Sequence, residues 1–270
     1  MTMHNLSKFV VTGLMGVVLT MFSVTTSAET VLITGSNSGI GLEFAKQYSA
    51  RGWNVIATHR RDRIPATLKE LSGRNSKVRV ERMDVTSRKD IDALAKRLAG
   101  TPIDVLINNA GAVLLGDYDD PKSGEAQQFG TLDYSQFDIF MHTNVLGPVM
   151  VVESLLDNIK AGKLKKIVNI SSAAGSITMP VRYPGMYWYK SSKTALNMVT
   201  KNLAFDLNKD GIIVIMFHPG GVRVEKLKDA DFPGMIEPAE SISGMIKVID
   251  GLTMDDSGKF LTHTGEVQPF

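Results

Sequence analysis

The sequence contains no cysteine and has almost no net charge. Without cysteine there is no disulfide framework, no thiolate metal site and no cysteine nucleophile. Lys and Arg number 30 against 28 Asp and Glu, a formal net charge of +2, which is too balanced to indicate a nucleic-acid surface or a polybasic membrane patch. The 270 residues are 43% hydrophobic, enough to bury a core in one domain or two small ones. The composition favours small-molecule chemistry, with no nucleic-acid partner and no metal.

Acidic residues are also missing from residues 1–28, which hold a single lysine, Lys8. An uncharged run at 9–24 and small residues up to Ala28 follow it, the layout of a secretory signal peptide cleaved after Ala28. The run is marginal for crossing a bilayer, so an uncleaved anchor that contacts the membrane through residues 9–24 is the second choice. A buried or disordered extension, or a later start at Met21, is the third. A working signal implies an exported or membrane-anchored protein, and its absence a cytoplasmic one.

From Thr30 onward, short β-branched runs alternate with longer amphipathic segments, and no linker divides them. We expect strands at 31–33, 53–58, 77–82, 104–107, 166–170 and 212–217. We expect helices at 41–50, 87–98, 134–159, 186–207 and 239–251, with Ser87 as an N-cap. This alternation predicts an α/β fold, a doubly wound parallel sheet flanked by helices, over residues 29–270. The irregular stretch 111–132, with an acidic cluster at 117–120, is interpreted as a surface loop near a site.

A glycine-rich turn, TGSNSGIG at 34–41, directly follows the first expected strand and opens a helix. This arrangement brings backbone N–H groups and the positive helix end up to a pyrophosphate, and a side chain at Gly35 or Gly39 would obstruct it. The alternative is a simple turn and helix cap. The second strand ends about 20 residues later, where the adenosine ribose of a dinucleotide is expected.

The end of that second strand reads THRR at 58–61, with no acidic residue. An acidic residue there would accept hydrogen bonds from a free ribose 2'-OH, whereas guanidinium groups favour a 2'-phosphate. The sequence therefore favours NADP(H), with NAD(H) as the alternative cofactor. Arg60, Arg61 and Arg63 could instead form only a solvated charged corner.

Tyr189 and Lys193 stand four residues apart, on one face of an expected helix. A phenol ordinarily loses its proton only near pH ~10, and a nearby ammonium group favours the phenolate, which would let Tyr189 exchange a proton near neutral pH. The alternative is that Tyr189 and Lys193 are an ordinary exposed i,i+4 pair on the helix surface, with no part in catalysis. The pair follows a strand that ends NISS at 169–172, and ligands of open α/β sheets bind beyond the carboxyl ends of strands.

Together, an ordered set of motifs resembles the short-chain dehydrogenase/reductase family. In chain order they are TGSNSGIG at 34–41, Asp84-Val85, NNAG at 108–111, Asn144, ISSAAG at 170–175, YKSSK at 189–193 and HPGG at 218–221. Residues 186–212, with the turn ATHR, are most similar to the C-factor and small carbonyl-reductase branch. The resemblance covers essentially everything after Thr30. It implies a single-domain Rossmann fold and an oxidoreductase that transfers a hydride between a nicotinamide and a carbonyl or alcohol.

The resemblance places the family's catalytic residues at Asn144, Ser172, Tyr189 and Lys193. Tyr189 would donate a proton to the substrate carbonyl oxygen, and Ser172 would hydrogen-bond that oxygen. Lys193 would bind the nicotinamide ribose and favour the phenolate, and Asn144 would hold a water in the proton path. The alignment with the family motif favours Ser172 over its neighbour Ser171, and only one of the two can serve, because adjacent strand residues point to opposite faces. Tyr187 is not equivalent to Tyr189, since position 191 is Ser rather than Lys.

The resemblance also implies the cofactor contacts. They are Gly35, Ser36, Asn37, Ser38, Gly39, Ile40 and Gly41 in the turn, His59 and Arg60 after the second strand, Asp84 and Val85 at the adenine, Asn108, Ala110 and Gly111 at the adenine ribose, and Tyr189, Lys193, Pro219, Gly220 and Val222 at the nicotinamide. Two positions depart from the family pattern. Ser38 replaces a basic residue that NADP-preferring relatives often carry, and Val224 replaces a threonine that would hydrogen-bond the cofactor.

The resemblance implies a substrate pocket between the segments 172–189 and 219–235. Its apolar residues predict a small hydrophobic carbonyl or alcohol substrate, although any one of them could equally pack in the core. They are Ile177, Met179, Val181, Tyr183, Met186, Trp188, Leu227, Phe232 and Met235.

Two other functions compete with the reductase hypothesis. One is a non-catalytic nucleotide-binding signalling protein of the C-factor type, and the other is a membrane-tethered interaction protein. For assembly, the helices expected at 134–159 and 186–207 form dimer and tetramer faces in many relatives, so a homodimer or homotetramer competes with a monomer.

Overall fold

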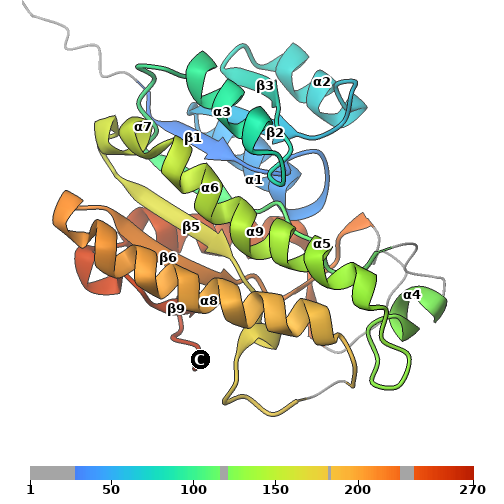
Figure 1. Ribbon diagram of the computed structural model, residues 1–270. Coiled ribbons are helices and arrows are strands. Elements are labelled where there is room, and N and C mark those ends of the chain that lie inside the picture. Colours follow the sequence, from blue (N-terminus) through green and yellow to red (C-terminus); the bar gives the residue numbers. More distant parts are fainter. Residues whose placement is uncertain (1–27, 116–120, 182–183, 226–233) are drawn as a thin grey trace, which may run out of the picture.

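A seven-stranded parallel sheet lies between two layers of helices in the computed structural model, which describes residues 28–115, 121–181, 184–225 and 234–270 (Figure 1). The strands are β1 (Thr30–Ile33), β2 (Asn54–His59), β3 (Val78–Arg82), β4 (Val105–Asn108), β5 (Lys166–Ile170), β6 (Ile213–His218) and β9 (Phe260–Thr262). Their order in the sheet is β3-β2-β1-β4-β5-β6-β9, and all neighbours pair in parallel. The predicted α/β fold, a doubly wound parallel sheet, is confirmed.

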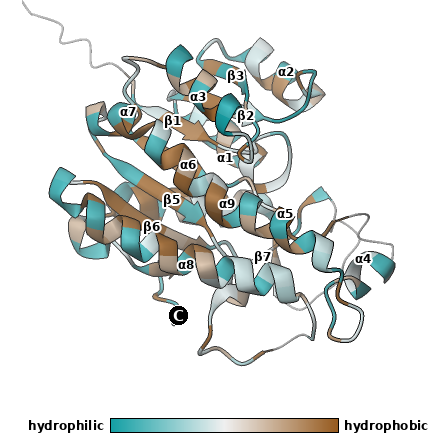
Figure 2. Ribbon diagram, in the orientation of Figure 1, coloured by the Kyte–Doolittle hydropathy of each residue, from teal (hydrophilic) through white to brown (hydrophobic). Residues whose placement is uncertain are grey.

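Helices cover both faces of the sheet. They are α1 (Gly39–Ala50), α2 (Ala66–Arg74), α3 (Arg88–Arg97), α6 (Gly147–Ser154), α7 (Leu156–Ala161), α8 (Tyr187–Leu207) and α9 (Pro238–Gly251). Figure 2 shows β1 and most of β5 and β6 in brown, the hydrophobic colour, whereas brown and teal alternate along helix α8. Successive strand residues enter different cores, because side chains alternate across a strand. Val31 and Ile33 pack with Phe44 of α1, while Leu32 packs with Ile91 of α3.

The segment predicted as a helix at 134–159 is helical almost throughout, but it is not a single regular helix. The segment consists of η1 (Tyr134–Gln136), α5 (Phe137–Met141), a π-helical turn η2 (His142–Leu146), then α6 and α7. Pro148 explains part of the irregularity. It has no N–H to donate to the carbonyl of Asn144, which would be its partner in an α-helix. The predicted N-cap Ser87 is correct, since its hydroxyl accepts the Asp90 N–H at 3.2 Å.

Several short elements were not predicted: α2, β9, the helix α4 (Pro121–Glu125) inside the stretch expected to be irregular, and a two-stranded sheet of β7 (Gly221–Val222) and β8 (Met235–Ile236). The acidic cluster 117–120 and the signal-like segment lie outside the described residues, apart from Ala28. Within the described ranges, no helix is both long enough and apolar enough to cross a membrane.

Candidate active site

The glycine-rich turn after β1 adopts a conformation that its glycines make accessible. Gly35 has φ +65° and Gly39 has φ +54°, both in the left-handed region. A Cβ on Gly35 would lie 2.9 Å from the Cα of Ala110. The turn therefore passes so close to the end of β4 that glycine is required by both conformation and space.

Asn109, a residue that the sequence reasoning passed over, ties this turn to β4. Its side-chain Nδ2 donates to the carbonyl oxygens of Thr34 at 2.9 Å and Gly35 at 3.0 Å. In return, the main-chain N–H groups of Asn109 and Ala110 each donate to Thr34 Oγ1 at 2.9 Å. The only sequence signal for this role was the second Asn of the motif NNAG.

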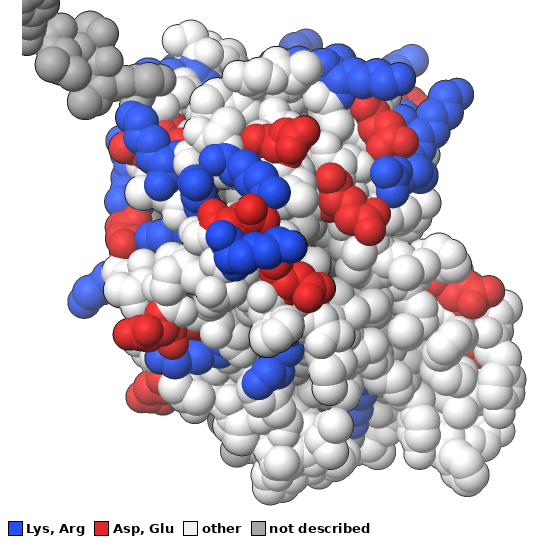
Figure 3. Space-filling model, turned by 60° about the vertical axis from the view of Figure 1, so that its left-hand side comes forward, with Lys and Arg blue, Asp and Glu red and all other residues white. Residues whose placement is uncertain are grey.

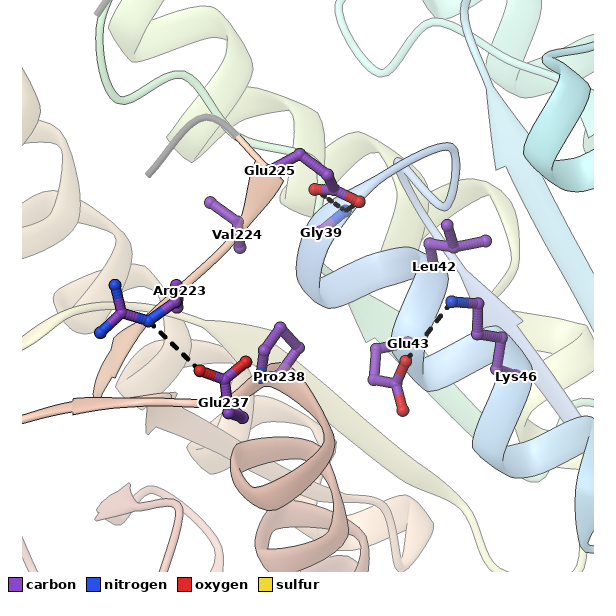
Figure 4. Close-up of a pocket in the computed structure, with 9 residues that line it drawn as sticks. All are labelled: Gly39, Leu42, Glu43, Lys46, Arg223, Val224, Glu225, Glu237 and Pro238. Carbon is purple, nitrogen blue, oxygen red and sulfur yellow. Dashed lines mark hydrogen bonds and ion pairs between the residues drawn. The ribbon is translucent and has the colours of Figure 1, made fainter. Parts of the chain in front are cut away.

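The start of α1 binds an anionic group through a main-chain N–H. The N–H of Gly39 donates to both carboxylate oxygens of Glu225, at 3.2 and 2.9 Å, and the preceding residue Ser38 makes no side-chain cap (Figure 4). The Glu225 carboxylate here stands in for the anionic oxygens of a phosphate. The contact borders a pocket of about 330 Å³, on whose other side Arg223 pairs with Glu237 at 3.2 Å. The helix start thus fits the pyrophosphate of a dinucleotide.

The carboxyl end of β2 carries exposed positive charge. Arg60, Arg61 and Arg63 are exposed, and among the described residues no ion pair involves them. His59 is 3% exposed, and burial lowers the pKa of its imidazole. The lowered pKa favours the neutral imidazole, so the positive charge at this corner comes mainly from the guanidinium groups.

The residues predicted around the adenosine occupy different depths. Asp84 is half-buried, and its Oδ1 accepts from the N–H of Thr86 at 2.9 Å and from that residue's hydroxyl at 2.8 Å. Val85 packs against Gly147. Asn108 is 3% exposed and donates to Asn169 Oδ1 of β5 at 2.8 Å, while its own Oδ1 is buried without a partner in the described structure. The Asn108 side chain therefore lies within the sheet.

Tyr189 and Lys193 lie together in the first two turns of α8, as the spacing predicts. Tyr189 is 9% exposed and Lys193 5%. The Lys193 ammonium lies 5.8 Å from the centroid of the Tyr189 ring and donates to the carbonyl oxygen of Ile170 at 2.8 Å. Burial lowers the pKa of Lys193 from 10.5 to about 8. The group is thus mostly charged at pH 7.

Asn144 lies beside this pair, and its side chain forms hydrogen bonds with other residues of the protein. Its Oδ1 accepts the Ala112 N–H at 2.7 Å, and its Nδ2 donates to the Ala112 carbonyl at 2.8 Å and to Ser192 Oγ at 2.9 Å. A Cβ on Gly111 would lie 3.3 Å from Asn144 Oδ1 and 3.7 Å from Lys193 Nζ. The NNAG motif, the π turn and α8 therefore meet at one point.

The two candidate serines differ in surroundings. Ser171 is 2% exposed and donates to Asn197 Oδ1 of α8 at 2.6 Å. Ser172 is half-buried and begins the short helix η3 (Ala173–Gly175), where its Oγ accepts the Ala174 N–H at 3.2 Å. η3 packs against α8, with Gly175 so close to Lys193 that a Cβ would lie 2.8 Å from the carbonyl carbon of that lysine. Of the two hydroxyls, that of Ser172 lies nearer the surface.

The segment predicted to meet the nicotinamide follows β6. Gly220 has φ +87°, and a Cβ there would lie 2.7 Å from Ile236 Cδ1. Pro219 accepts a hydrogen bond from the Ser241 hydroxyl at 2.6 Å through its carbonyl, and Val222 is buried in β7. Among the expected pocket residues, Ile177 and Val181 are each 78% exposed. Tyr183, Leu227 and Phe232 lie outside the described residues.

Comparison with known proteins agrees with this geometry. Residues 29–231 match the family model described as short chain dehydrogenase. The chain is 34% identical to 1-hydroxy-2-glutathionyl-2-methyl-3-butene dehydrogenase of Rhodococcus sp. (strain AD45), covering 86% of this chain and 95% of the relative. It is 34% identical to C-signal of Myxococcus xanthus, over 66% of this chain and 99% of that protein. The NADPH-bound carbonyl reductase from chicken fatty liver superposes with a TM-score of 0.80 at 28% identity, covering 91% of this chain and all of that one (100%).

The chain belongs to the short-chain dehydrogenase/reductase family, and its fold is that of the family's carbonyl reductases.

Proposed function

We propose that the protein is an NADP(H)-dependent carbonyl reductase, with Tyr189 as its general acid and base. The observation that carries this proposal is the buried Lys193 ammonium over the buried Tyr189 ring, 5.8 Å from its centroid, next to Asn144 and Gly111. An ammonium in that position favours the phenolate and so lets the phenol give up a proton near neutral pH. A merely structural pair on an exposed helix face would not be buried in this way.

The chain's own residues fit a dinucleotide. The turn 35–41 would hold the pyrophosphate at the N-terminus of α1, where Gly39 now binds a carboxylate. Arg60 and its neighbours would bind a 2'-phosphate, and Asp84 has one carboxylate oxygen directed to the turn at Thr86 and a second for the adenine amino group. Val222, Gly220 and Pro219 would face the nicotinamide, which supplies the hydride when the cofactor is bound. The NADPH that the chicken carbonyl reductase binds supports the preference for NADP(H), whereas Ser38 does not add to it.

In this proposal the phenol of Tyr189 donates its proton to the substrate carbonyl oxygen as that oxygen gains charge. Ser172 donates a hydrogen bond to the same oxygen. Lys193, charged at pH 7, stabilises the phenolate left behind. Because the Asn144 side chain is bound to Ala112 and Ser192, a water in the proton path would bind its main-chain carbonyl, which Pro148 leaves without an α-helical donor.

The substrate class follows from the surface next to Ser172. Charged side chains of both signs crowd the upper part of the face drawn in Figure 3, and few lie at its lower end, at the height of the loop after β5. The loop after β5 exposes Ile177 and Val181. We therefore propose a small hydrophobic ketone or aldehyde, or the corresponding alcohol. A homodimer or homotetramer through the segments 134–159 and 186–207, and membrane contact through residues 9–24, are separate proposals.

The test uses the chain from Glu29 with NADPH and a panel of aliphatic and aromatic carbonyls, comparing Tyr189→Phe with Tyr187→Phe. Tyr187 is the matched control, since its ring lies in the same turn but packs on Phe129 with centroids 6.3 Å apart. We expect Tyr189→Phe to lose at least about 100-fold in kcat with NADPH binding retained, and Tyr187→Phe to keep most activity. NADPH binding without turnover of any carbonyl would instead favour a non-catalytic protein such as the signalling alternative that the C-signal relative suggests.

A further inference from the structure

Helix α8, which carries Tyr189, begins without a cap from its own sequence. The N-cap residue is Met186, whose φ of +57° is left-handed and whose side chain makes no cap hydrogen bond. The first N–H groups of a helix have no partner inside the helix, so they need acceptors from elsewhere. Tyr189 lies within this first turn. Any fraying of the helix start would move its phenol.

Gln127 supplies the missing acceptors from a segment about 60 residues earlier in the chain. Its carbonyl oxygen accepts the Tyr187 N–H at 3.2 Å. Its side-chain Oε1 accepts the N–H of Tyr189 itself at 3.0 Å. The residue is completely buried, at 0% exposure. A buried amide that is hydrogen-bonded to a helix start holds that start in one place. If the helix start moved away, buried polar groups would be left without hydrogen-bond partners.

The other end of the same amide reaches the segment that binds Asn144. Gln127 Nε2 donates to the carbonyl oxygen of Val113 at 3.0 Å. The preceding residue, Ala112, binds the Asn144 side chain through both its N–H and its carbonyl. One amide therefore connects the Tyr189 main chain to the loop after β4 that binds Asn144. The site requires an acceptor on one side and a donor on the other, which glutamine provides and which neither methionine nor glutamate provides at neutral pH.

A second contact keeps the Gln127 segment in place. The Trp188 indole N–H donates to the Asp133 carbonyl at 3.0 Å, and a Cβ on Gly185 would lie 3.2 Å from the Gln127 carbonyl oxygen. The segment 127–133 thus contacts the α8 start at both of its ends, through Gln127 and through Asp133. None of the turn residues 35–41 contacts Gln127 in the described hydrogen bonds.

We propose that Gln127 is a positioning residue, which fixes Tyr189 relative to Asn144 and leaves cofactor binding untouched. The inference rests on the proposed function of Tyr189. It assigns a catalytic consequence to a residue that makes no contact with the reacting atoms. A misplacement of a reacting group by about 1 Å can cost about 100-fold in rate.

The test compares Gln127→Met and Gln127→Glu with Gln128→Met in the full chain. Gln128 is the matched control because it is the exposed neighbour. For Gln127→Met we expect kcat to fall about 10-fold to 100-fold, with the NADPH Kd within about twofold of the parent, and faster hydrogen exchange at the amides of 187–189. For Gln128→Met we expect none of these changes.

Gln127→Glu adds a readout that a purely structural role would not give. As a carboxylate it faces the Val113 carbonyl with no donor, so activity near neutral pH should drop. Once protonated, the carboxylic acid both donates and accepts, so activity relative to the parent should recover towards acidic pH. This variant also keeps the test decisive if Gln127→Met fails to fold.

A kcat of Gln127→Met within twofold of the parent, or unchanged amide exchange at 187–189, would overturn the inference. Loss of kcat that is equal in Gln128→Met, or a Gln127→Glu pH profile parallel to that of the parent, would do the same. The proposed function fails separately, if the parent protein reduces no carbonyl. In that case faster exchange at 187–189 in Gln127→Met supports Gln127 as the anchor of the α8 start, and unchanged exchange refutes it.

Discussion

Replacing Glu225 by glutamine should strengthen NADPH binding. In the described structure its carboxylate holds the Gly39 N–H at 2.9 and 3.2 Å, at the helix start that a pyrophosphate would use. One N–H cannot serve both anions fully. The dinucleotide must therefore displace Glu225, and the side chain that it displaces remains nearby with a charge of the same sign.

The magnitude follows from two contributions. A charge-assisted hydrogen bond contributes more than a neutral one, but Glu225 is exposed, so we take about 1 kcal/mol for its loss. Two like charges about 6 Å apart in water repel by a further ~0.7 kcal/mol, and salt screens part of this. Glutamine keeps a weaker hydrogen bond and no charge. We expect the NADPH Kd of Glu225→Gln to be about fivefold lower at low ionic strength, with a smaller difference at high ionic strength.

The assay is a fluorescence titration of NADPH at two ionic strengths, repeated with Glu237→Gln. Glu237 lines the same pocket but pairs with Arg223 rather than with Gly39 (Figure 4). It therefore controls for a general loss of negative charge. An NADPH Kd for Glu225→Gln that is equal to or higher than that of the parent would refute the reasoning. So would an equal gain in Glu237→Gln.

Three further outcomes follow from the geometry. Arg60→Ala should raise the KM for NADPH about tenfold and change that for NADH little, because a guanidinium at the adenosine ribose would act only on the 2'-phosphate; steady-state kinetics with both cofactors tests this, and an unchanged ratio would contradict it. The lowered pKa of Lys193, about 8 in the folded protein against 10.5, means that the unfolded chain binds an extra proton between those pH values. The free energy of unfolding should therefore rise with pH from about 8 to 10.5 in the parent more than in Lys193→Met, measured by urea unfolding; equal slopes would argue against a buried Lys193. Asn109→Ala loses hydrogen bonds to the carbonyls of Thr34 and Gly35 and should lower the free energy of unfolding by about 2 kcal/mol. This corresponds to a Tm lower by about 4–8 °C in a calorimetric scan, and a Tm within about 1 °C of the parent would contradict the prediction.

The sheet could be predicted from the sequence because a parallel strand buried on both faces is apolar throughout. Runs such as 31–33 and 213–217 show this directly. α2 escaped prediction because Leu68 is its only buried residue, so no apolar stripe marks it. β9 is three residues long, too short for a periodic pattern. The sequence held a signal for the irregularity in the helix predicted at 134–159, namely Pro148. That the carbonyl it leaves without an α-helical donor is that of Asn144, beside Tyr189 and Lys193, appears only in the folded chain.

Some residues of the candidate site could likewise be predicted from the sequence, and others could not. Tyr189 and Lys193 are visible in sequence because helical spacing alone places them together. The positive φ of Gly35 and Gly39 was likewise implied by the turn that they form. Asn109 and Gln127 were not found, because each acts through hydrogen bonds from its side chain to a distant main chain. Such bonds depend on which loops meet, and no spacing of residue types encodes them.

The tie between Gln127 and α8 has a consequence for engineering. In many enzymes the loops that recognise the substrate can be exchanged as modules while the catalytic helix is left alone. Here the segment around Gln127 contacts the loop beside Asn144 and also caps the helix that carries Tyr189, the proposed proton donor. Substrate preference and turnover would therefore change together in any loop graft, unless the graft keeps a glutamine at position 127.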